Sequence, residues 1–552
     1  MNKKILIVGG VAGGASAAAR LRRLDEHAEI IMFEKGEYIS FANCGLPYYI
    51  GGEIEKRASL ILQTPEAFRG RFNVDVRICS EVAAIDRTKK TVTVKNHKTG
   101  ESYTERYDSL ILSPGAEPIK PSIGGVDSKG VFTLRNLSDT DRIKNFIAEN
   151  KPHTVAIVGG GYIGVEMAEN LHKAGLDVTL IEMLNQVIAP LDFDMACGVH
   201  RHIESKGVKL LLETAVKSIQ GHNGKLQVEL SKGSLDVDML ILSIGVRPET
   251  GLARHAGLEL NERGSIIVDG NMRTSDKDIY AVGDAVEVTD FVTGQRTFIP
   301  LAGPANKQGR IAADNICGIE SRYTGTQGSA ILRVFDMTVA TTGVNEKTAA
   351  RLGLDYDKIF THPTSHAMYY PGFEYTAIKT LFDRKTGKIL GAQVVGFEGC
   401  DKNCDVLATA IRFGATAKDL TELELCYAPP YSSAKDPVNM IGFAIENLLS
   451  GKYRQIHWHD YGKLPRDGSV IFLDTRMKEE SEGAPIGGFI NIPTNELRNR
   501  LHELDKNKTI YVSCRVGLQG YITCRMLSQH GFTCYNFSGG YRLYKDLFGV
   551  KK

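Results

Sequence analysis

Cys44 lies in the stretch ISFANCGLPYYIGG, residues 39–52, where its surroundings favour chemistry. It stands in a turn directly before Gly45, Leu46 and Pro47, and proline is well suited to the first turn of a helix. We therefore expect the sulfur at a helix N-terminus, where backbone N–H groups and the helix dipole lower the pKa of a thiol. A thiolate can attack a disulfide or persulfide and hold the product as a mixed disulfide. The alternative, a cysteine that fills a hole in the core, is common for isolated cysteines but fits a turn poorly.

Cys44 has no second cysteine at short spacing, so the sulfur that completes its redox pair must come from a substrate. The ten cysteines stand at positions 44, 79, 197, 317, 400, 404, 426, 514, 524 and 534, without a CxxC pair. This scatter lacks the density of a disulfide framework and predicts reduced thiols in the cytoplasm.

Cys514 ends the apolar strand TIYVS and opens a glycine-bearing loop before a helix. Successive N–H groups in such a loop can form a nest around an anionic sulfur, which suits a carried persulfide. We expect Cys524 and Cys534, on the following helix and strand, to be packing residues. Cys400 and Cys404 are spaced as CxxxC, but no further cysteine or histidine pair accompanies them, so we expect no metal site.

Two stretches repeat one design that is typical of dinucleotide binding. KKILIVGGVAGGASAAARLRRL is followed by AEIIMFEKG, and HTVAIVGGGYIGVEMAENLHKAG is followed by DVTLIEMLN. Each indicates a buried strand, a glycine turn, a helix and a second strand that ends in an acid. One glycine turn alone is weak support, but its repetition predicts two nucleotide-binding βαβ units.

The second unit has the full glycine spacing, at Gly159, Gly161 and Gly164, followed by Glu182. The first unit has Gly9, Val11 and Gly14, followed by Glu34, with Gly10 and Gly13 beside the valine. Glycines let the backbone approach a pyrophosphate at the helix N-terminus, and the acid takes a ribose hydroxyl pair. An acid at 182 would repel a 2′-phosphate, so the second site is predicted to prefer NADH to NADPH.

The length of 552 residues requires several domains, and 67 basic against 65 acidic side chains create no global field for nucleic acid or a membrane surface. The N-terminus resembles a signal peptide, but glycines interrupt its apolar run after four residues, and a strand and glycine turn explain it better. No apolar run of about 18 residues predicts a membrane span.

The rest of the chain changes pattern twice. TSDKDIYAVGDAVE indicates a strand that ends in Gly283-Asp284, with a helix starting near AGPANKQGRIAADNICG. Strands and hairpins follow from about 322, a linker covers 450–462, and short apolar strands alternate with helices over 463–552.

With SFANCG, YDSLILSPGA and IYAVGDA in this order beside the two glycine turns, residues 1 to about 450 resemble the pyridine nucleotide-disulfide oxidoreductases. Within that family they resemble the single-cysteine branch that contains coenzyme A disulfide reductase, NADH oxidase and NADH peroxidase. SFANCG, HAMYYPG and YAPPYSSAKDP are similar to the coenzyme A disulfide reductase group, and FLDTR and CRVGLQG to rhodanese loops. The two-domain arrangement looks like the NADH-dependent coenzyme A disulfide, persulfide or polysulfide reductases fused to rhodanese.

The resemblance implies an α/β chain with two nested Rossmann-like dinucleotide-binding domains, an α+β dimerisation domain and a C-terminal α/β rhodanese domain. The FAD domain would comprise 1–148 and 260–321, the NADH domain 149–259, the dimerisation domain 322–449 and the rhodanese domain 463–552. The motif positions implied to bind FAD or NADH are Gly9, Gly10, Ala12, Gly13, Gly14, Glu34, Lys35, Pro114, Gly115, Gly159, Gly161, Tyr162, Ile163, Gly164, Glu182, Gly245, Gly283, Asp284, Pro300, Leu301, Ala302 and Lys435. Asn306 stands where the pattern often has histidine.

The resemblance also implies a coenzyme A site and two partner tyrosines. The coenzyme A contacts would be Ser16, Arg20, Arg23, Ser40, Phe41, Asn43, Arg71 and Tyr427. An arginine cluster such as Arg20, Arg22 and Arg23 is usually a solvated face, and the family match favours a ligand. Tyr369 and Tyr427 would reach across a homodimer and donate to the leaving thiolate, with Tyr370 as the alternative to Tyr369.

These features together predict a cytoplasmic, homodimeric FAD enzyme that uses NADH to reduce coenzyme A persulfide or disulfide, and polysulfide as a further candidate. Cys44, Tyr369, Tyr427 and Cys514 are the predicted catalytic residues, and Cys514 would carry sulfane sulfur. Gln519 stands where rhodanese-like loops commonly have arginine, which leaves the sulfur donor open. The alternatives are an NADH oxidase or peroxidase that cycles Cys44 through sulfenic acid, and a redox-sensing flavoprotein without turnover.

Overall fold

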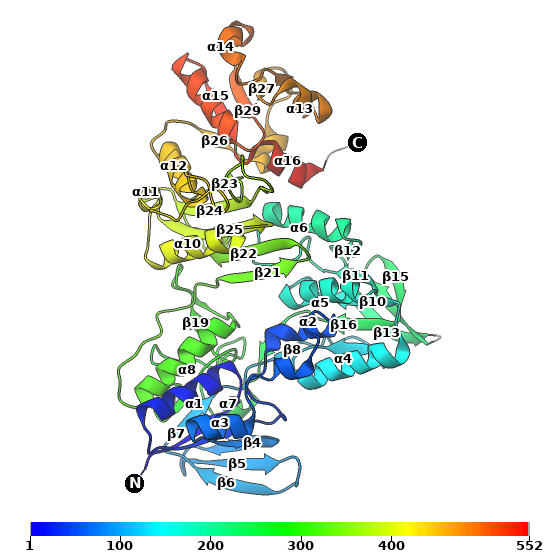
Figure 1. Cartoon of the computed structure of the whole chain (residues 1–552), viewed down its shortest axis with the longest axis vertical. Coiled ribbons are helices and arrows are strands. Elements are labelled where there is room, and N and C mark those ends of the chain that lie inside the picture. Colours follow the sequence, from blue (N-terminus) through cyan, green and yellow to red (C-terminus); the bar gives the residue numbers. More distant parts are fainter. Residues whose placement is uncertain (1, 223, 550–552) are drawn as a thin grey trace. The chain divides into compact units, whose positions relative to one another are not determined.

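The computed structural model describes residues 2–222 and 224–549, and the chain separates into two compact units (Figure 1). One unit comprises the chain up to Val187 together with Gly207–Gly328, and the other comprises Ile188–Lys206 and the chain from Ser329 onward. Each unit holds two of the four main sheets.

The first unit contains two parallel five-stranded sheets, one for each glycine turn. The first has the order β18-β7-β1-β2-β3, formed by Ile279–Ala281, Ser109–Leu112, Lys4–Val8, Glu29–Phe33 and Asp75–Arg77. The second has the order β12-β11-β10-β16-β9, formed by Lys209–Leu211, Asp177–Ile181, Thr154–Val158, Met239–Leu242 and Val131–Thr133. Their central strands are continuous apolar runs because elements cover both faces of a parallel sheet. The two predicted βαβ units are confirmed.

Helices and smaller antiparallel sheets complete this unit. The helices are α1 Ala12–Leu24, α2 Leu46–Ile50, α3 Pro65–Phe72, α4 Leu137–Asn150, α5 Tyr162–Lys173, α7 Gly251–His255 and α8 Ala302–Ile316. The three-stranded sheets are β4 Ser80–Asp86, β5 Thr91–Asn96 and β6 Ser102–Arg106, and β13 Val216–His222, β14 Lys225–Leu230 and β15 Gly233–Val237. The two-stranded sheets are β8 Ala116–Pro118 with β17 Val246–Pro248, and β19 Val288–Thr289 with β20 Arg296–Thr297. Helix α1 packs along α8 (Figure 1), which brings the two ends of the FAD motif set together.

The second unit contains an antiparallel sheet with the order β21-β22-β25-β24-β23. Its strands are Ala330–Val334, Met337–Gly343, Ile389–Gly396, Ala377–Asp383 and Tyr356–Thr361. Helix α10, Cys400–Arg412, packs on β22 and β25, and the unit also holds α6 Phe193–Ser205, α9 Glu346–Arg351, α11 Ala417–Thr421 and α12 Pro437–Leu449.

A buried lysine binds α6 and α9 to this antiparallel sheet. The Nζ of Lys379 lies 2.8 Å from Asp194, 3.0 Å from Asp192 and 2.7 Å from Glu346, and the side chain has no exposed surface. Burial alone would lower the pKa of Lys379, but the three carboxylates outweigh it and raise that pKa. Segment 188–206 is thus held by charge to the sheet of the dimerisation domain.

A parallel sheet with the order β26-β30-β29-β27-β28 forms the C-terminal domain. Its strands are Gln455–Ile456, Cys534–Phe537, Thr509–Ser513, Val470–Asp474 and Ile490–Asn491. Its helices are α13 Lys478–Gly483, α14 Leu497–Arg500, α15 Leu518–Gln529 and α16 Gly540–Phe548. Together with the sheets above, this domain confirms the predicted fold class.

Residues 450–462, which the sequence assigns to a linker, contribute to the C-terminal domain. Strand β26 pairs with β30, and Trp458 is buried with its ring stacked 4.0 Å from that of Phe537. The indole N–H donates to the carbonyl of Gly540. One two-residue strand, a 3-10 turn and a single tryptophan give too little periodicity to be separated from a linker by sequence.

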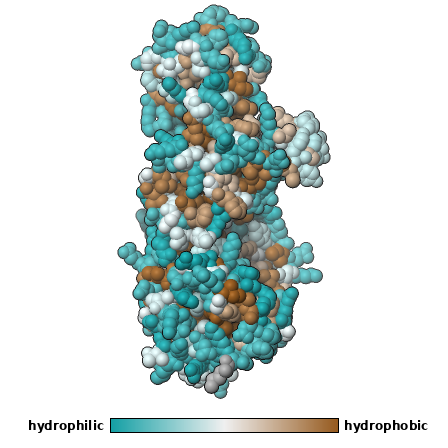
Figure 2. All heavy atoms as spheres, turned by 90° about the vertical axis from the view of Figure 1, so that its left-hand side faces the viewer, coloured by the Kyte–Doolittle hydropathy of each residue, from teal (hydrophilic) through white to brown (hydrophobic). Residues whose placement is uncertain are grey.

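Several large apolar side chains in the second unit are exposed. They include Ile331, Met368, Tyr369, Tyr427, Tyr431, Phe413 and Phe443. Figure 2 presents one face of the molecule, on which hydrophobic side chains lie among hydrophilic ones. In the described part of the chain, no helix combines the length and apolar character needed to cross a membrane.

Candidate functional site

The first glycine turn is held by its acid. Oε2 of Glu34 accepts from the N–H of Gly10 at 3.0 Å, and Oε1 accepts from Gly36 at 2.8 Å. Gly9 has a φ of +97°, and a Cβ on Gly14 would meet the carbonyl oxygen of Gly9 at 1.9 Å. Both positions therefore require glycine, whereas Val11 has an ordinary extended backbone.

The second turn repeats this geometry. Glu182 accepts from Gly160 at 2.7 Å and from Leu184 at 2.8 Å, and Gly159 has a φ of +106°. A Cβ on Gly164 would meet the carbonyl oxygen of Gly159 at 1.9 Å, while a Cβ on Gly161 would point into open space. Gly161 thus faces the side on which a phosphate would lie, and the close helix–strand contact is made by Gly164.

The helices after these turns begin without side-chain caps. Val11, Gly161 and Leu301 precede α1, α5 and α8, and none of their side chains accepts a hydrogen bond from the first helical turn. The first-turn N–H groups of a helix need partners, and an anion such as a pyrophosphate supplies them. Three helix N-termini that carry predicted cofactor residues are therefore chemically suited to phosphate groups.

The other predicted cofactor positions surround these turns. Gly283 has a φ of +80° and donates to Gln308 of α8 at 2.7 Å, which places Asp284 beside the helix, and burial raises the pKa of Asp284. The remaining ones also occupy loops or helix starts. In the loops, Gly115 and Gly245 have positive φ, Lys35 pairs with Glu249, and the Pro114 carbonyl accepts from Arg135. At the helix starts lie Ala12 and Gly13 of α1, Tyr162 and Ile163 of α5, and Pro300, Leu301 and Ala302 at α8. Lys435 lies in the other unit, exposed just before α12.

Cys44 stands in a short 3-10 turn, Asn43–Gly45, directly before α2. The segment that leads to it is tied to the first glycine turn, because the N–H of Ser40 donates to the carbonyl of Gly10 at 3.0 Å. Ser40 adopts a left-handed φ of +43°, and Phe41 bridges to Ile61. These contacts hold Ser40, Phe41, Asn43 and Cys44 as one strand-to-turn segment beside the predicted FAD phosphate site.

The protein raises the pKa of the Cys44 thiol. Loss of hydration is the first cause, and the negative charges of Glu166 and Asp284 add to it, although a backbone hydrogen bond opposes them. The predicted lowering of this pKa is therefore wrong for the polypeptide, since burial and two carboxylates outweigh the backbone hydrogen bond. The sulfur nevertheless remains exposed to a reagent.

Glu166 is a site residue that the sequence analysis missed. It lies on α5, which packs against α2, and accepts from the hydroxyl of Tyr48 at 3.3 Å. Burial raises the pKa of Glu166 to about 7, the Tyr48 hydrogen bond opposes this, and Glu169 adds to it. The only sequence signal was its place two residues after Gly164 in the second glycine turn, where it could be taken for an ordinary helix residue.

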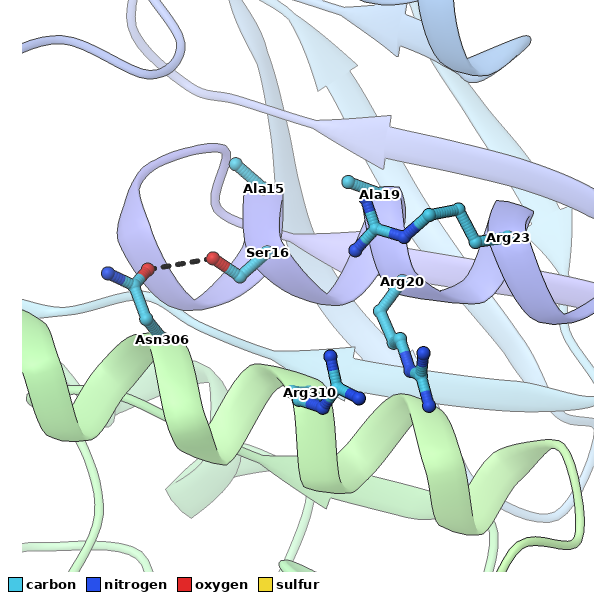
Figure 3. Close-up of a pocket in the computed structure, with 7 residues that line it drawn as sticks. All are labelled: Ala15, Ser16, Ala19, Arg20, Arg23, Asn306 and Arg310. Atoms are coloured by element: carbon cyan, nitrogen blue, oxygen red, sulfur yellow. Dashed lines mark hydrogen bonds between the residues drawn. The ribbon is translucent and has the colours of Figure 1, made fainter.

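A pocket of about 390 Å³ lies between α1 and α8, lined by Ala15, Ser16, Ala19, Arg20, Arg23, Asn306 and Arg310 (Figure 3). Ala15 and Ala19 leave room on α1, and the hydroxyl of Ser16 donates to Asn306 Oδ1 at 2.7 Å. The guanidinium of Arg20 is 2.6 Å from Asp314, which holds it in place. The pocket thus gathers three guanidinium groups, which suit an anionic ligand with phosphates.

The pocket refines the predicted arginine set. Arg310 was missed, although it lies one helical turn after Asn306 on α8 and both face α1 (Figure 3). Arg22, in contrast, is buried and donates to the carbonyls of Asp25, Glu26, Ala28, Phe72 and Asn73. Arg22 therefore stabilises the fold and is not available to a ligand. Arg71 is exposed on α3 and does not line the pocket.

Tyr369 and Tyr427 form a pair at the surface of the second unit. Their hydroxyl oxygens are 3.1 Å apart, and this hydrogen bond raises the pKa of Tyr369. Tyr370 instead turns its ring toward His366, at 5.6 Å between ring centroids. The pairing therefore favours Tyr369 over Tyr370 as the working residue.

Cys514 lies in the predicted nest. Its side chain has no exposed surface, and the N–H of Gly517 donates to Sγ at 3.1 Å. Complete burial raises the pKa of the Cys514 thiol, while backbone N–H groups of Gly520, Val516, Gly517 and Gln519 lower it. The loop is thus arranged for an anionic sulfur, with backbone donors in place of an arginine at Gln519, which is exposed.

The remaining cysteines of interest are buried. Cys524 on α15 and Cys534 on β30 pack in the core of the C-terminal domain, as predicted. Burial raises the pKa of Cys400 and of Cys404 to about 12 on α10. Within residues 2–222 and 224–549, no group of three or more histidine, cysteine or acidic side chains is arranged to hold a metal ion.

Comparison with known families divides the chain into three parts. Residues 3–309 match the pyridine nucleotide-disulphide oxidoreductase model, residues 329–437 match its dimerisation domain, and residues 458–547 match the rhodanese-like domain. A coenzyme A disulfide reductase of Staphylococcus epidermidis is 38% identical over 442 residues, which are 80% of this chain and 99% of that protein.

Two solved structures resemble nearly the whole chain. The reduced Bacillus anthracis CoADR-RHD is 52% identical, with a TM-score of 0.97 over 99% of this chain and 98% of that one. A NAD-dependent persulfide reductase from A. fulgidus is 36% identical, with a TM-score of 0.92 over 98% and 100% of the two chains. A water-forming NADH oxidase from Lactobacillus brevis is 29% identical, with a TM-score of 0.78 over 81% of this chain and 99% of that one.

Proposed function

This chain belongs to the pyridine nucleotide-disulphide oxidoreductases, and from that premise we propose that it reduces coenzyme A persulfide or disulfide through Cys44. The observation that carries the proposal is the arginine-lined pocket between α1 and α8, in the same unit as Cys44. A substrate that brings both phosphates and a sulfur fits this combination. The relatives named for coenzyme A disulfide and persulfide reduction support the same substrate class.

The family implies FAD and NAD(P)H, and the residues present fit both. The first glycine turn, Glu34 and Asp284 would hold FAD, and the second turn with Glu182 would hold the nicotinamide cofactor. Because both Glu182 oxygens already face the turn, we favour NADH over NADPH, whose 2′-phosphate this carboxylate would repel. When bound, the flavin supplies two electrons taken from NADH.

Cys44 would act as the nucleophile. Its thiolate attacks the sulfur of coenzyme A in the persulfide, which forms a mixed disulfide and releases hydrosulfide; with the disulfide, it releases one coenzyme A thiolate. The mixed disulfide then takes up two electrons, which regenerates the Cys44 thiolate and frees coenzyme A. Tyr369 and Tyr427, whose hydroxyls form one hydrogen-bonded pair, would donate the proton that the departing thiolate needs.

The dimerisation domain supports a homodimer in which each chain lends its tyrosine pair to the other. The exposed rings of Tyr369 and Tyr427 are suited to that contact. The C-terminal domain would carry sulfane sulfur on Cys514 and supply persulfide to coenzyme A. We therefore prefer the persulfide to the disulfide as substrate and place the enzyme in the cytoplasm, where thiols stay reduced.

Mass spectrometry of the purified protein, followed by steady-state kinetics of NADH consumption, tests the proposal. Coenzyme A linked to Cys44, together with a higher kcat/KM for coenzyme A persulfide under argon than for peroxide, is the expected result. Oxidised Cys44 without coenzyme A, and a higher kcat/KM for peroxide, would favour the oxidase or peroxidase alternative. The similarity to the Lactobacillus brevis NADH oxidase is the observation that keeps this alternative open.

A redox sensor without turnover gives a third pattern. NADH would reduce bound FAD once, but no sulfur acceptor would sustain steady NADH consumption. Stopped-flow flavin absorbance, followed by steady-state assays with persulfide, disulfide and polysulfide, separates this outcome from catalysis.

A further inference from the structure

The hairpin of β23 and β24 continues beyond its sheet toward Tyr369. Thr376 donates to the carbonyl of Pro363 at 2.9 Å, Ser365 donates to that of Glu374 at 2.7 Å, and Thr364 bridges to Tyr375. These bonds pair the two sides of the segment 362–376, which we call the hairpin extension. The extension is therefore an ordered element of the dimerisation domain and not a loose loop.

The base of the hairpin extension contacts the glycine turn that supports the Cys514 loop. The N–H of Phe360, on β23, donates to the hydroxyl of Ser538 at 3.2 Å. A Cβ on Gly539 would lie 3.1 Å from the Cβ of Phe360. The next turn residue, Gly540, packs so closely on the loop that its Cβ would meet the Cys514 carbonyl oxygen at 2.5 Å.

The hairpin extension also contacts the Cys514 loop directly. The buried ring of His362 lies beside the backbone of Val516. Val516 is one of the residues whose N–H groups favour an anionic Cys514. A residue of the dimerisation domain is therefore in contact with the nest itself.

Tyr375 joins two arginines of the C-terminal domain. The guanidinium of Arg542 lies 3.9 Å from the centroid of its ring, and Arg515 is hydrogen bonded to its side chain. Arg515 also pairs with Glu480, and the N–H of Arg542 donates to the carbonyl of Arg515 at 3.0 Å. Tyr375 thus holds the residue that follows Cys514 and the helix α16 that supports it.

The C-terminal domain anchors only part of the loop by itself. Tyr541 donates to the carbonyl of Cys514 at 2.6 Å, and Asn536 donates to that of Gly517 at 3.0 Å. The side chain of Arg515 pairs with Glu480 of the same domain and in addition meets Tyr375 of the hairpin extension, whose His362 lies beside the backbone of Val516. We propose that the dimerisation domain completes the sulfurtransferase site, with Tyr375 as a positioning residue that keeps the Cys514 nest in the conformation that binds a sulfur anion.

This inference rests on the sulfur-carrying role proposed for Cys514, and it adds that the role depends on a residue of another domain. The test uses the full-length holoenzyme and three variants. Tyr375→Leu removes the ring and the hydroxyl, Tyr375→Phe removes only the hydroxyl that meets Arg515, and Tyr535→Phe is the control. Tyr535 lies on β30 beside a different arginine, Arg454.

Two measurements report on the position of Cys514. The first is the pH dependence of Cys514 alkylation by iodoacetamide, followed by peptide mass spectrometry. The second is sulfur transfer from thiosulfate to cyanide, resolved into kcat and KM. In Tyr375→Leu we expect the pH midpoint of alkylation to rise, so that the alkylation rate near neutral pH falls by ~5-fold or more. The kcat for sulfur transfer should fall by ~10-fold. Tyr375→Phe should show a smaller change in the same direction, and Tyr535→Phe should match the parent.

An unchanged alkylation profile in both Tyr375 variants would overturn the inference. If Tyr375→Leu does not fold, Tyr375→Phe decides, and alkylation indistinguishable from that of Tyr535→Phe counts against it. If the parent protein transfers no sulfur from thiosulfate or to coenzyme A, the proposed role of Cys514 fails. The alkylation profiles still show in that case whether Tyr375 positions the loop, so the two failures can be told apart.

Discussion

Cys44 and Cys514 are two cysteine sites built on opposite principles. Cys44 stands exposed in a 3-10 turn, and partial loss of hydration, together with the carboxylates of Glu166 and Asp284, raises the pKa of its thiol. Cys514 is fully buried, which raises the pKa of its thiol as well, but it lies in a loop whose N–H groups converge on the sulfur and oppose that rise. The Cys44 site is open to a large substrate, and its surroundings disfavour the thiolate form of the cysteine. The Cys514 site excludes solvent and has built-in donors for a negative charge, which suits a carrier of a small sulfur anion.

Removing either sulfur should separate the two activities most strongly. We expect Cys44→Ser to lower NADH-dependent reduction of coenzyme A disulfide by ~10³-fold or more, because serine cannot form the mixed disulfide. Sulfur transfer from thiosulfate should remain within about twofold of the parent. Steady-state NADH oxidation and thiocyanate formation measure the two.

Cys514→Ser should give the reverse pattern, with thiocyanate formation lost and disulfide reduction retained. Cys317→Ser, a half-buried cysteine at the end of α8, is the control for cysteine removal. Loss of both activities in either single variant would contradict a division of labour between the two cysteines.

A methyl group at Gly540 should damage only the buried site. Gly540 has a φ of +56°, and an added Cβ would approach the N–H nitrogens of Gly517 and Val516 at 2.8 and 2.9 Å. Gly540→Ala should therefore destabilise the C-terminal domain by about 2 kcal/mol and abolish sulfur transfer. Denaturant unfolding and the thiosulfate assay provide the measurements.

Gly549→Ala is a matched control for this variant. Gly549 also has a positive φ, +70°, but a Cβ there would meet no atom within 4 Å. It should lose a similar amount of backbone stability while sulfur transfer is retained. Equal loss of sulfur transfer in both variants would show that backbone strain, and not contact with the nest, is responsible.

Charge removal at Glu166 should make the thiolate of Cys44 easier to form. Because burial raises the pKa of Glu166 to about 7, its charge develops mainly above neutral pH and then opposes the Cys44 thiolate. In the apoprotein, Glu166→Gln should speed alkylation of Cys44 at pH 8 by roughly threefold and have little effect at pH 6. Glu149→Gln, at an exposed position on α4, is the control.

The same carboxyl makes a prediction for stability. Its pKa of about 7 in the folded protein lies above the ordinary glutamate value of 4.5, so the unfolded chain loses this proton first as the pH rises. Stability should therefore fall between about pH 4.5 and 7 in the parent, and this decrease should be smaller in Glu166→Gln. If the free energy of unfolding falls equally with pH in both proteins over that range, the result would count against a buried Glu166 charge.

The sequence predicted these two sites unequally, for physical reasons. The glycine turns, their acids and both cysteines follow from local spacing, because a backbone that approaches a phosphate or cradles a sulfur needs particular residues at fixed intervals. The electrostatics of Cys44 did not follow, since Glu166 comes from another helix and its burial depends on tertiary packing. Arg22 and Arg23 are neighbours in sequence, yet one binds five carbonyls and the other lines a pocket. Helical spacing alone could not decide which arginine faces inward.

The pocket between α1 and α8 offers the finest test of the contrast, because the two sites should differ in their need for phosphates. Arg310→Ala removes one of the three guanidinium groups that line the pocket and leaves the paired Arg20 in place. We expect the KM for coenzyme A disulfide to rise by ~5–10-fold with kcat nearly unchanged, because the arginine binds a part of the substrate that does not react. The KM for thiosulfate at Cys514 should not change. Arg106→Ala, an exposed arginine on β6, is the control, and an equal rise in KM for both substrates would mean that Arg310 acts through the fold and not through the ligand.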